Sequence, residues 1–307
     1  MRSAAILAHY DPDGYAAPYV LRVLDQLGEC FDDVVVASTA RLTEDARETL
    51  RQRSTLVERE NLGQDFGGWQ EVLRDHVRVE DLGRLLLTND TYVGFLRPLG
   101  SIIEEMSQRP LEYWGITENQ QIARHIQSFF VMVNEPLLQS RVWDRFWGDF
   151  TAGSVRQDVI LQHEVGMSRA FHEAGFDGAA YFDPTAEDVA LAGERETWRR
   201  SRMAELHPEV QQPAVYQTNY TYALADAALD GGRLPLVKIE VLRHDPCFLG
   251  DAVLLGLCEE RYPDAFAGVR DHLVRTASAY LPRAGENPGG ATLPAELKAR
   301  LGYRTRL

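Results

Sequence analysis

Three short segments of the chain carry side chains that could bind a ligand or transfer a proton. Residues 9–13 read His-Tyr-Asp-Pro-Asp, residues 61–65 read Asn-Leu-Gly-Gln-Asp, and Asn89-Asp90 follows Leu-Leu-Leu-Thr. Carboxylate, amide and imidazole groups bind sugar hydroxyls, bases and cations. Each segment follows an apolar run. If these runs are parallel strands, the three segments lie together, because the carboxyl ends of such strands form the ligand edge of an open sheet.

The loop at residues 61–68, Asn-Leu-Gly-Gln-Asp-Phe-Gly-Gly, lies between a predicted strand and a predicted helix. Its glycines allow the backbone to approach a ligand closely, and a helix start offers free N–H groups to an anion. The loop matches neither the dinucleotide fingerprint nor the P-loop. The alternative interpretation is structural: Asp65 caps the helix, and Asp90 likewise caps the turn that follows it.

A candidate for proton transfer comes later in the chain. Glu164, preceded by His163, opens a helix predicted at residues 164–174. It could act as a general base or be a solvated first-turn residue favoured by the helix dipole. His125 and Gln127 stand near aromatic residues, a combination that suits sugar recognition. In the alternative interpretation they satisfy buried backbone groups.

Basic residues follow in the C-terminal third. Lys238 is one of only two lysines among 32 basic residues, and Arg243-His244 follows it closely. Lys238 and Arg243 could neutralise a departing diphosphate, and His244 could bind a metal or a phosphate. The alternative is a set of surface charges at a helix end.

The elements that would position these residues alternate between strand and helix. Strands are expected at residues 4–8, 34–37, 55–58 and 85–87, with helical spacing between them. This pattern predicts an α/β fold, a mostly parallel sheet flanked by helices. Later elements are less regular: strands at 113–116 and 129–133, a helix at 141–150, a polar segment at 185–205, and helices at about 218–229, 251–260 and 265–280.

The division expected from these patterns is a catalytic domain at residues 1–210, a helical C-terminal portion at 211–283 that completes the site, and a loosely ordered tail at 284–307.

Composition excludes several classes of protein. The formal net charge of -14 argues against general nucleic-acid binding and against broad adsorption to anionic lipid. Three cysteines without metal-ligand spacing suit a reducing compartment. No zincin, serine esterase or CxxC motif occurs. With no signal peptide and no apolar run of membrane-span length, we expect a cytoplasmic protein.

Six of these segments in their order resemble the rhamnan synthesis F family of bacterial glycosyltransferases. They are HYDPDG, ENLGQDFGGW, LLLTNDTYVGFL, YWGIT with HIQSFFVM, HEVGMS, and LPLVKIEVLRHDP, spanning about residues 4–246. The resemblance implies a GT-A-like nucleotide-sugar fold of Rossmann type. Two positions depart from the family pattern: His163 replaces a Tyr, and Leu236 replaces a Phe. The family's Asn-Pro-Thr-His stretch is reduced to residues 219–222 here.

The resemblance also implies roles for individual residues. Glu164 would be the catalytic base, and Asp90 would keep the carboxylate of the family's DXD-like motif. The nucleotide-sugar site would comprise His9, Asp11, Asn61, Gly63, Asp65, Asn89, Lys238 and Arg243. His125, Gln127, Ser128 and Trp114 would face the donor sugar or the acceptor. A divalent cation, Mn²⁺ or Mg²⁺, would be held near Asp90, with His244 as a further candidate ligand.

The function expected from the resemblance is transfer of rhamnose or a similar deoxyhexose from a nucleoside-diphosphate sugar, with dTDP-rhamnose favoured. The acceptor would be a polysaccharide or lipid-linked glycan of the cell surface. A partner protein could hold such an enzyme at the inner face of the membrane. The alternatives are a non-catalytic member that binds a nucleotide sugar or glycan within a biosynthetic complex, and a nucleotide-sugar hydrolase.

Overall fold

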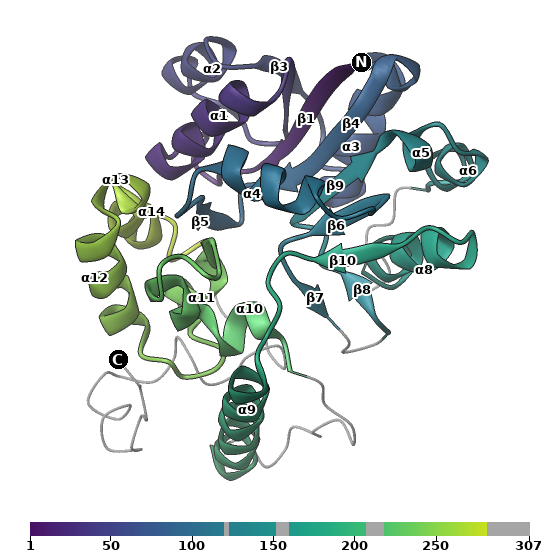
Figure 1. Cartoon of the computed structure of the whole chain (residues 1–307). Coiled ribbons are helices and arrows are strands. Elements are labelled where there is room, and N and C mark those ends of the chain that lie inside the picture. The colour runs from purple at the N-terminus through teal and green to yellow at the C-terminus, as the bar shows by residue number, and fades with distance from the viewer. Residues whose placement is uncertain (120–122, 152–159, 207–217, 281–307) are drawn as a thin grey trace. The chain divides into compact units, whose positions relative to one another are not determined.

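The computed structural model describes residues 1–119, 123–151, 160–206 and 218–280 (Figure 1). The chain forms two compact units. The first combines Met1–Asp90 with Arg97–Tyr181, and the second combines Thr91–Leu96 with the chain from Phe182 onward. The division therefore falls at Tyr181, whereas the sequence pattern suggests residue 210. The tail expected at residues 284–307 lies outside the described residues.

The first unit is built on a seven-stranded sheet in the order β10-β6-β9-β4-β1-β2-β3. Only β9 runs antiparallel to its neighbours; the other pairs are parallel. The predicted α/β class with a mostly parallel sheet is confirmed. The strands are β1 (Arg2–His9), β2 (Asp33–Ser38), β3 (Thr55–Glu58), β4 (Leu82–Asn89), β6 (Tyr113–Gly115), β9 (Phe130–Asn134) and β10 (Gly178–Ala180).

The order of the strands fixes where a ligand would bind. Strands β3, β2, β1 and β4 are neighbours in the order found in doubly wound folds. The chain moves outward from β1 to β2 and β3, then returns to place β4 on the other side of β1. The edge between the carboxyl ends of β1 and β4 is therefore the topological switch point, where open α/β sheets bind ligands.

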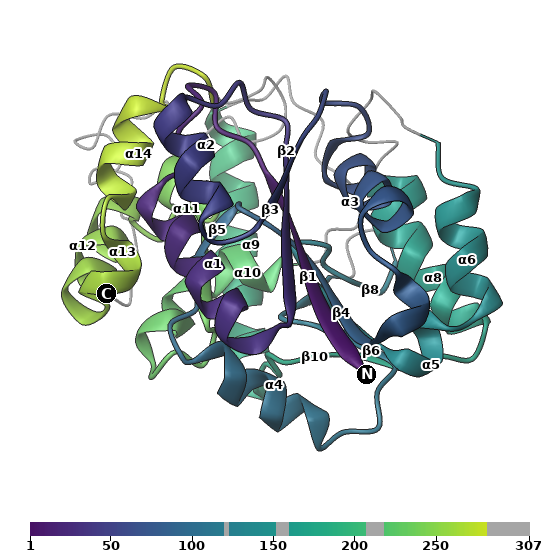
Figure 2. The same cartoon turned by 90° about the horizontal axis from the view of Figure 1, so that it is seen from above.

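Helices cover both faces of this sheet (Figure 2). One face carries α1 (Pro18–Cys30), α2 (Glu44–Arg51) and α4 (Leu99–Ser107); the other carries α3 (Gln64–Asp75), α5 (Glu135–Leu138), α6 (Arg141–Gly148) and α8 (Gly166–Glu173). Ala4, Ile6 and Ala8 of β1 join one buried cluster with Trp69 of α3 and Phe171 of α8. Alternate residues of a strand point to opposite faces, so the apolar runs predicted as strands are buried on both sides.

Between β6 and α8 the first unit has smaller elements. A hairpin pairs β7 (Glu118–Asn119) with β8 (His125–Ile126). The segment Ile160–Val165 is π-helical and leads directly into α8. The sequence pattern predicts a helix from Glu164, and its first two residues belong to the π-helical turn that precedes α8.

The second unit is mainly helical, as predicted, with one short antiparallel pair between β5 (Tyr92–Gly94) and β11 (Leu236–Lys238). Its other elements are α9 (Ala186–Leu206), α10 (Tyr220–Ala223), a 3-10 turn (Ala225–Leu229), α11 (Ile239–His244), α12 (Asp251–Arg261), α13 (Pro263–Phe266) and α14 (Val269–Arg275). The polar segment 185–205 forms helix α9. One expectation is corrected: the helix expected at 265–280 is interrupted at Gly268, whose φ is +72°.

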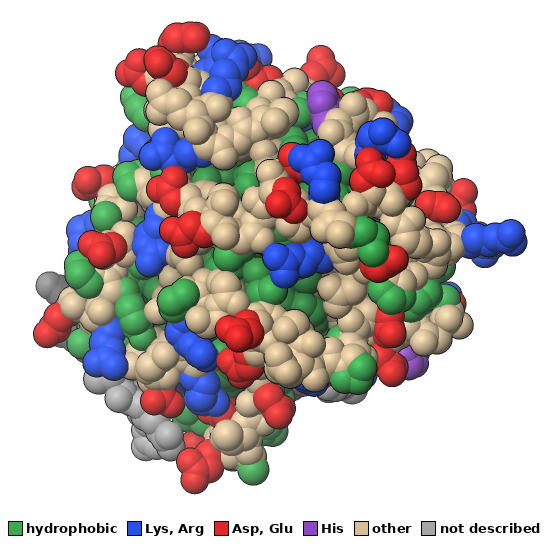
Figure 3. All heavy atoms as spheres, turned by 45° about the horizontal axis from the view of Figure 1, so that its top comes forward, with side chains coloured by type: hydrophobic (Ala, Val, Ile, Leu, Met, Phe, Trp, Pro, Cys, Tyr) green, Lys and Arg blue, Asp and Glu red, His purple; other side chains and the backbone are tan. Residues whose placement is uncertain are grey.

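Two findings bear on the environment of the protein. Among the described residues, no helix combines the length and apolar character needed to cross a bilayer. On the face seen in Figure 3, acidic and basic side chains are interspersed, with no single basic patch.

Candidate functional site

The loops that follow β1 and β4 meet at the switch point. Ala8 of β1 pairs with Asn89 of β4, so the two strands end side by side. The backbone N–H of Tyr10 donates to the Asp90 carboxylate at 2.7 Å, and the Tyr19 hydroxyl donates to the Asp90 carbonyl at 3.1 Å. The structure thus brings together two of the three polar segments singled out in the sequence.

Asp90 has an unusual electrostatic environment. Loss of solvent around its carboxyl, followed by the negative charges of Asp65 and Asp11, raises its pKa to about 7. The Tyr10 N–H opposes this shift. Asp11 is 2% exposed and accepts hydrogen bonds from the backbone N–H groups of Asp13 (2.9 Å) and Tyr15 (3.2 Å). Negative charge is therefore concentrated at the switch point.

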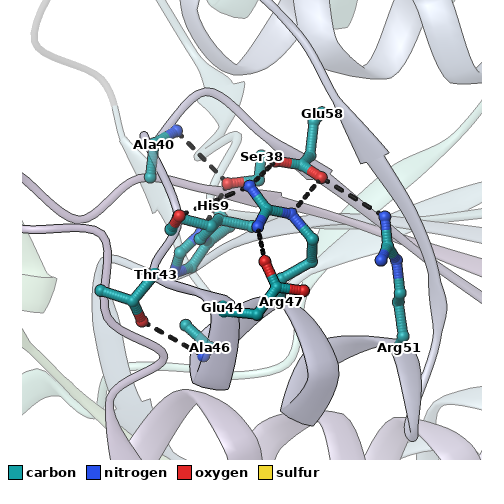
Figure 4. Close-up of polar contacts among 10 residues, drawn as sticks. His9, Ser38, Ala40, Thr43, Glu44, Ala46, Arg47, Arg51 and Glu58 are labelled. Atoms are coloured by element: carbon teal, nitrogen blue, oxygen red, sulfur yellow. Dashed lines mark hydrogen bonds and ion pairs between the residues drawn. The ribbon is translucent and has the colours of Figure 1, made fainter.

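His9, the last residue of β1, points toward the end of β2 (Figure 4). Its Nδ1 lies 3.0 Å from the Ser38 hydroxyl, which also accepts the N–H of Ala40 at 3.3 Å. Burial lowers the pKa of His9 to about 4, against the attraction of Asp11 and a hydrogen bond to the backbone of Tyr15. The ring is therefore neutral at pH 7 and can offer hydrogen bonds but no positive charge. Ser38 was not a sequence candidate, although its position at a strand end could have suggested it.

The third polar segment reaches the same edge through α3. The Asn89 side chain donates from Nδ2 to the Asp65 carboxylate at 2.8 Å. Gly63, with φ of +76°, precedes the helix, and its neighbour Asn61 is exposed.

The backbone around α3 is tightly folded. A Cβ added at Gly67 would lie 1.9 Å from the Leu62 carbonyl oxygen, so only glycine fits there. The Arg59 guanidinium donates to the same carbonyl at 3.0 Å and to Glu71 at 2.9 Å. These contacts fix the loop at residues 61–63 against the start of the helix.

Glu164, in the π-helical turn, lies beside the start of β9, the strand that runs antiparallel to its neighbours. Because β9 runs antiparallel, its beginning lies beside the end of β4, where the Thr88 hydroxyl donates to the Phe129 carbonyl at 2.7 Å. The Glu164 Oε1 accepts the backbone N–H of Ser128 at 2.9 Å, and His125 Nε2 lies 3.9 Å from the same oxygen. His125 Nδ1 faces the Ala123 carbonyl at 2.7 Å, so this nitrogen carries a hydrogen.

The remaining predicted sugar contacts differ in their surroundings. The side-chain oxygen of Gln127 accepts the Thr117 hydroxyl at 2.7 Å, and the Gln127 N–H donates to the Thr117 carbonyl at 3.0 Å. Trp114 is 3% exposed in β6, and its ring packs 5.2 Å from that of Phe130. The ring is therefore packed in the interior, and its assignment as a sugar contact stays a prediction.

The predicted basic residues and His244 belong to the second unit. Lys238, in β11, is buried and contacts the Thr91 hydroxyl. Arg243 donates to the Thr276 hydroxyl at 2.9 Å and lies 4.1 Å from the Tyr280 ring centroid. Burial lowers the pKa of His244. Their assignment to a nucleotide or metal site stays a prediction.

Within the described ranges, no group of three or more His, Cys, Asp or Glu side chains could hold a metal ion. Asp90, Asp65 and Asp11 act on one another through their charge but do not form a complete set of ligands.

The fold defines an open α/β protein with a cluster of polar side chains at its switch point, which is the candidate ligand site. The chain belongs to the family of rhamnan synthesis protein F, whose family model matches residues 34–200.

Curated relatives are similar over part of their length. An "Uncharacterized protein y4gN" from Sinorhizobium fredii is 24% identical over 193 residues, covering 61% of this chain and 50% of that protein. "Virulence protein VirA" from Vibrio anguillarum is 31% identical over 129 residues, covering 39% of each chain. The chain thus spans half or less of the length of these relatives. A 4-diphosphocytidyl-2C-methyl-D-erythritol synthase from Anaerococcus prevotii matches with a TM-score of 0.36 and 7% identity, over 58% of this chain and 87% of that chain.

Proposed function

We propose that the protein is a glycosyltransferase that moves rhamnose or a similar deoxyhexose from a nucleoside-diphosphate sugar, with dTDP-rhamnose as the favoured donor. The acceptor is a polysaccharide or a lipid-linked glycan. Membership in the rhamnan synthesis family supports the class of reaction. The observation that carries the proposal is the position of the Asp90 carboxylate, held by the Tyr10 N–H at the switch point between β1 and β4.

The donor is proposed to bind at this edge. Neutral His9 and buried Asp11 offer hydrogen bonds to the nucleoside, and the loop with Asn61 and Gly63 approaches it through its backbone. Asp65 and Asn89, which hold one another, line the same edge. Neutralisation of the departing diphosphate by Lys238 and Arg243 stays a prediction from the sequence pattern.

A divalent cation fits the donor set, although the protein offers only part of the coordination. Mg²⁺ is usually held by one or two carboxylates together with substrate phosphates. Asp90, with Asp65 beside it, would hold the ion, and His244 is a further candidate from the sequence. When bound, the cation would offset negative charge on the diphosphate.

Glu164 is proposed as the general base. The Ser128 N–H holds its Oε1, which leaves Oε2 to take the proton. The acceptor oxygen forms a bond to the anomeric carbon, the bond from that carbon to the diphosphate oxygen breaks with its electron pair, and the acceptor proton passes to Oε2. His125 and Ser128 lie beside the Glu164 carboxylate, and Gln127 is bonded to Thr117. All three residues are proposed to contact the sugars.

The test combines binding with transfer. A thermal-shift panel of dTDP-, UDP- and GDP-sugars, each with and without Mn²⁺ or Mg²⁺, identifies the donor, because a ligand of the folded state raises Tm. Transfer is then measured for wild type, Glu164→Gln and Glu118→Gln. Glu118 is the matched control, since it pairs with Arg124 in the same part of the fold.

We expect Glu164→Gln to lose transfer by about 10²–10⁴-fold while keeping the donor-induced shift, and Glu118→Gln to keep both. Normal transfer by Glu164→Gln would exclude it as the base. Donor binding without transfer would instead support a non-catalytic binding member, and sugar release without acceptor would support a hydrolase.

A further inference from the structure

A cluster of aromatic rings lies between the first turn of α3 and the π-helical turn that carries Glu164. We define the aromatic cluster as Phe66, Trp69, Trp147, Phe150 and His163. Phe66 is near its centre, with ring centroids at 4.8 Å from Trp69, 6.1 Å from Trp147 and 5.5 Å from His163. The cluster therefore connects the start of α3 with segments about 80–100 residues later in the chain.

His163 is the member of the aromatic cluster that belongs to the π-helical turn. It is 6% exposed, and its ring stands 4.4 Å from Phe150 and 5.5 Å from Phe66. Both ring pairs are tilted, with interplanar angles of 37° to Phe150 and 34° to Phe66. The side chain is thus packed as an aromatic ring between two phenylalanines.

The polar atoms of this imidazole do not explain its position. Among the described residues, Nε2 is buried without a hydrogen-bond partner. Burial lowers the pKa of His163, although a hydrogen bond to the backbone of Thr151 opposes this, so the ring is neutral. A buried polar atom that is left unpaired costs stability. Packing against Phe66 and Phe150 therefore does more to place this ring than its hydrogen bonds do.

The position of His163 relates two chemically important residues. Phe66 directly follows Asp65, and His163 directly precedes Glu164. The contact between the Phe66 and His163 rings therefore connects two sequence neighbours of the proposed site. Asp65, beside Phe66, is proposed to line the donor site, and Glu164, beside His163, is the proposed base. Irregular π-helical turns are frequent at functional sites, where their backbone places a side chain that a regular helix would not.

We infer that His163 is a positioning residue, which sets the distance between the Glu164 carboxylate and the donor-binding start of α3 through the packing of its ring. This inference rests on the proposed function. The ring acts by contact and not by proton transfer, so an apolar ring of similar size should replace it. Removing the ring should free the turn, and a displacement of about 1 Å at a catalytic group costs about 10²-fold in rate.

The experiment compares His163→Ala with His163→Phe. For His163→Ala we expect kcat to fall by about 10²-fold with little change in the KM for the donor, because Asp65 remains held by Asn89. His163→Phe should restore kcat to near the wild-type value. Phe31→Ala is the control for loss of a buried aromatic ring, since Phe31 is also 6% exposed but its ring packs against Arg84 and not against the aromatic cluster; it should leave kcat near normal.

A second measurement does not depend on activity. Amide hydrogen exchange at residues 163–165 should be faster in His163→Ala than in wild type and unchanged in His163→Phe. If Glu164→Gln keeps transfer while this exchange pattern is observed, the proposed function fails and the ring contact stands. Normal kcat in His163→Ala, or equal losses of kcat in His163→Ala and His163→Phe, would overturn the positioning role.

Discussion

The Asn89 side-chain amide donates to the Asp65 carboxylate at 2.8 Å, although the two residues lie 24 positions apart in the chain. One is the last residue of β4, and the other lies in the first turn of α3. This contact fixes a carboxylate near Asp90, whose pKa it raises. The hydrogen bond therefore links the start of α3 to the end of β4 and holds a negative charge near Asp90.

Asp65→Asn separates these two effects. Asparagine keeps an oxygen that can accept from Asn89 but removes the charge. We expect the variant to fold normally and to lower the pKa of Asp90 from about 7, because one of the two repelling carboxylates is gone. The check is the pH dependence of Tm, in which the descending limb should move to lower pH. An unchanged limb would show that Asp65 does not act on Asp90.

Asp90 should make the protein less stable as pH rises. Its pKa is about 7 in the folded state against an ordinary 3.8, so the folded state binds its proton more tightly. This contribution to the free energy of unfolding is complete below pH 3.8 and is lost as pH rises to about 7. Asp90→Asn removes the penalty, and its Tm at pH 8 should exceed that of wild type by roughly 2–4 °C per kcal/mol gained.

The same variant should behave oppositely with ligand. Since Asp90 is proposed to hold a cation with the donor diphosphate, Asp90→Asn should lose the extra Tm shift that Mn²⁺ gives to the dTDP-sugar complex. A full metal-dependent shift in Asp90→Asn would exclude it as a ligand.

Gly67→Ala should disrupt the donor loop. The added Cβ would meet the Leu62 carbonyl oxygen at 1.9 Å, a backbone atom that cannot move without displacing residues 61–63. We expect the donor-induced Tm shift to disappear. Gly28→Ala is the control, because a Cβ there meets nothing within 4 Å. It should be neutral or stabilising by up to about 1 kcal/mol, since Gly28 lies in a helix.

Ser38→Ala should weaken the support of His9. The hydroxyl is the hydrogen-bond partner of His9 Nδ1 and of the Ala40 N–H, and all three groups are buried. Leaving buried polar groups unpaired costs about 1–3 kcal/mol, measurable by denaturant unfolding. Ser107→Ala, which removes a hydroxyl from the exposed end of α4, should change stability by less than about 0.5 kcal/mol.

His9 should also make the fold sensitive to acid. Its pKa is about 4 in the folded state against an ordinary 6.5, so the unfolded state takes up the proton first. The stability that neutral His9 contributes is complete above pH 6.5 and is lost as pH falls to about 4. His9→Asn should flatten this acid limb of the Tm profile. A limb that persists in His9→Asn must arise from another group.

The strands of the first unit are predictable from sequence because they are buried on both faces. A run such as residues 85–87 is apolar throughout, and it forms the middle of β4. The polar segments follow from the same logic, since each begins where an apolar run ends. Residue types alone did not indicate Ser38, because a serine at a strand end is common and its partner comes from another strand.

Features that the sequence pattern misses have a different physical origin. The segment 185–205 is polar in sequence, but it forms α9, and some of its charged side chains are buried in ion pairs. Arg195 pairs with Asp226 at 2.7 Å, and Arg199 pairs with Glu196 at 2.8 Å. Hydropathy counts such residues as exposed, whereas pairing allows them to be buried. Residue type also leaves Trp114 open, because aromatic rings suit both sugar contacts and the core where this ring packs beside Phe130.

The pairing of β5 with β11 has a consequence for synthesis on the ribosome. Tyr92–Gly94 emerges more than a hundred residues before Leu236–Lys238, the strand that completes it. Until then, Tyr92 and Val93, both fully buried in the finished fold, have no sheet partner. A nascent chain that stops short of residue 236 therefore presents an open apolar edge to other chains. A chain cut after Tyr181 still contains residues 91–96 of the second unit without their partner strand, and it should aggregate unless these residues are replaced by a polar linker.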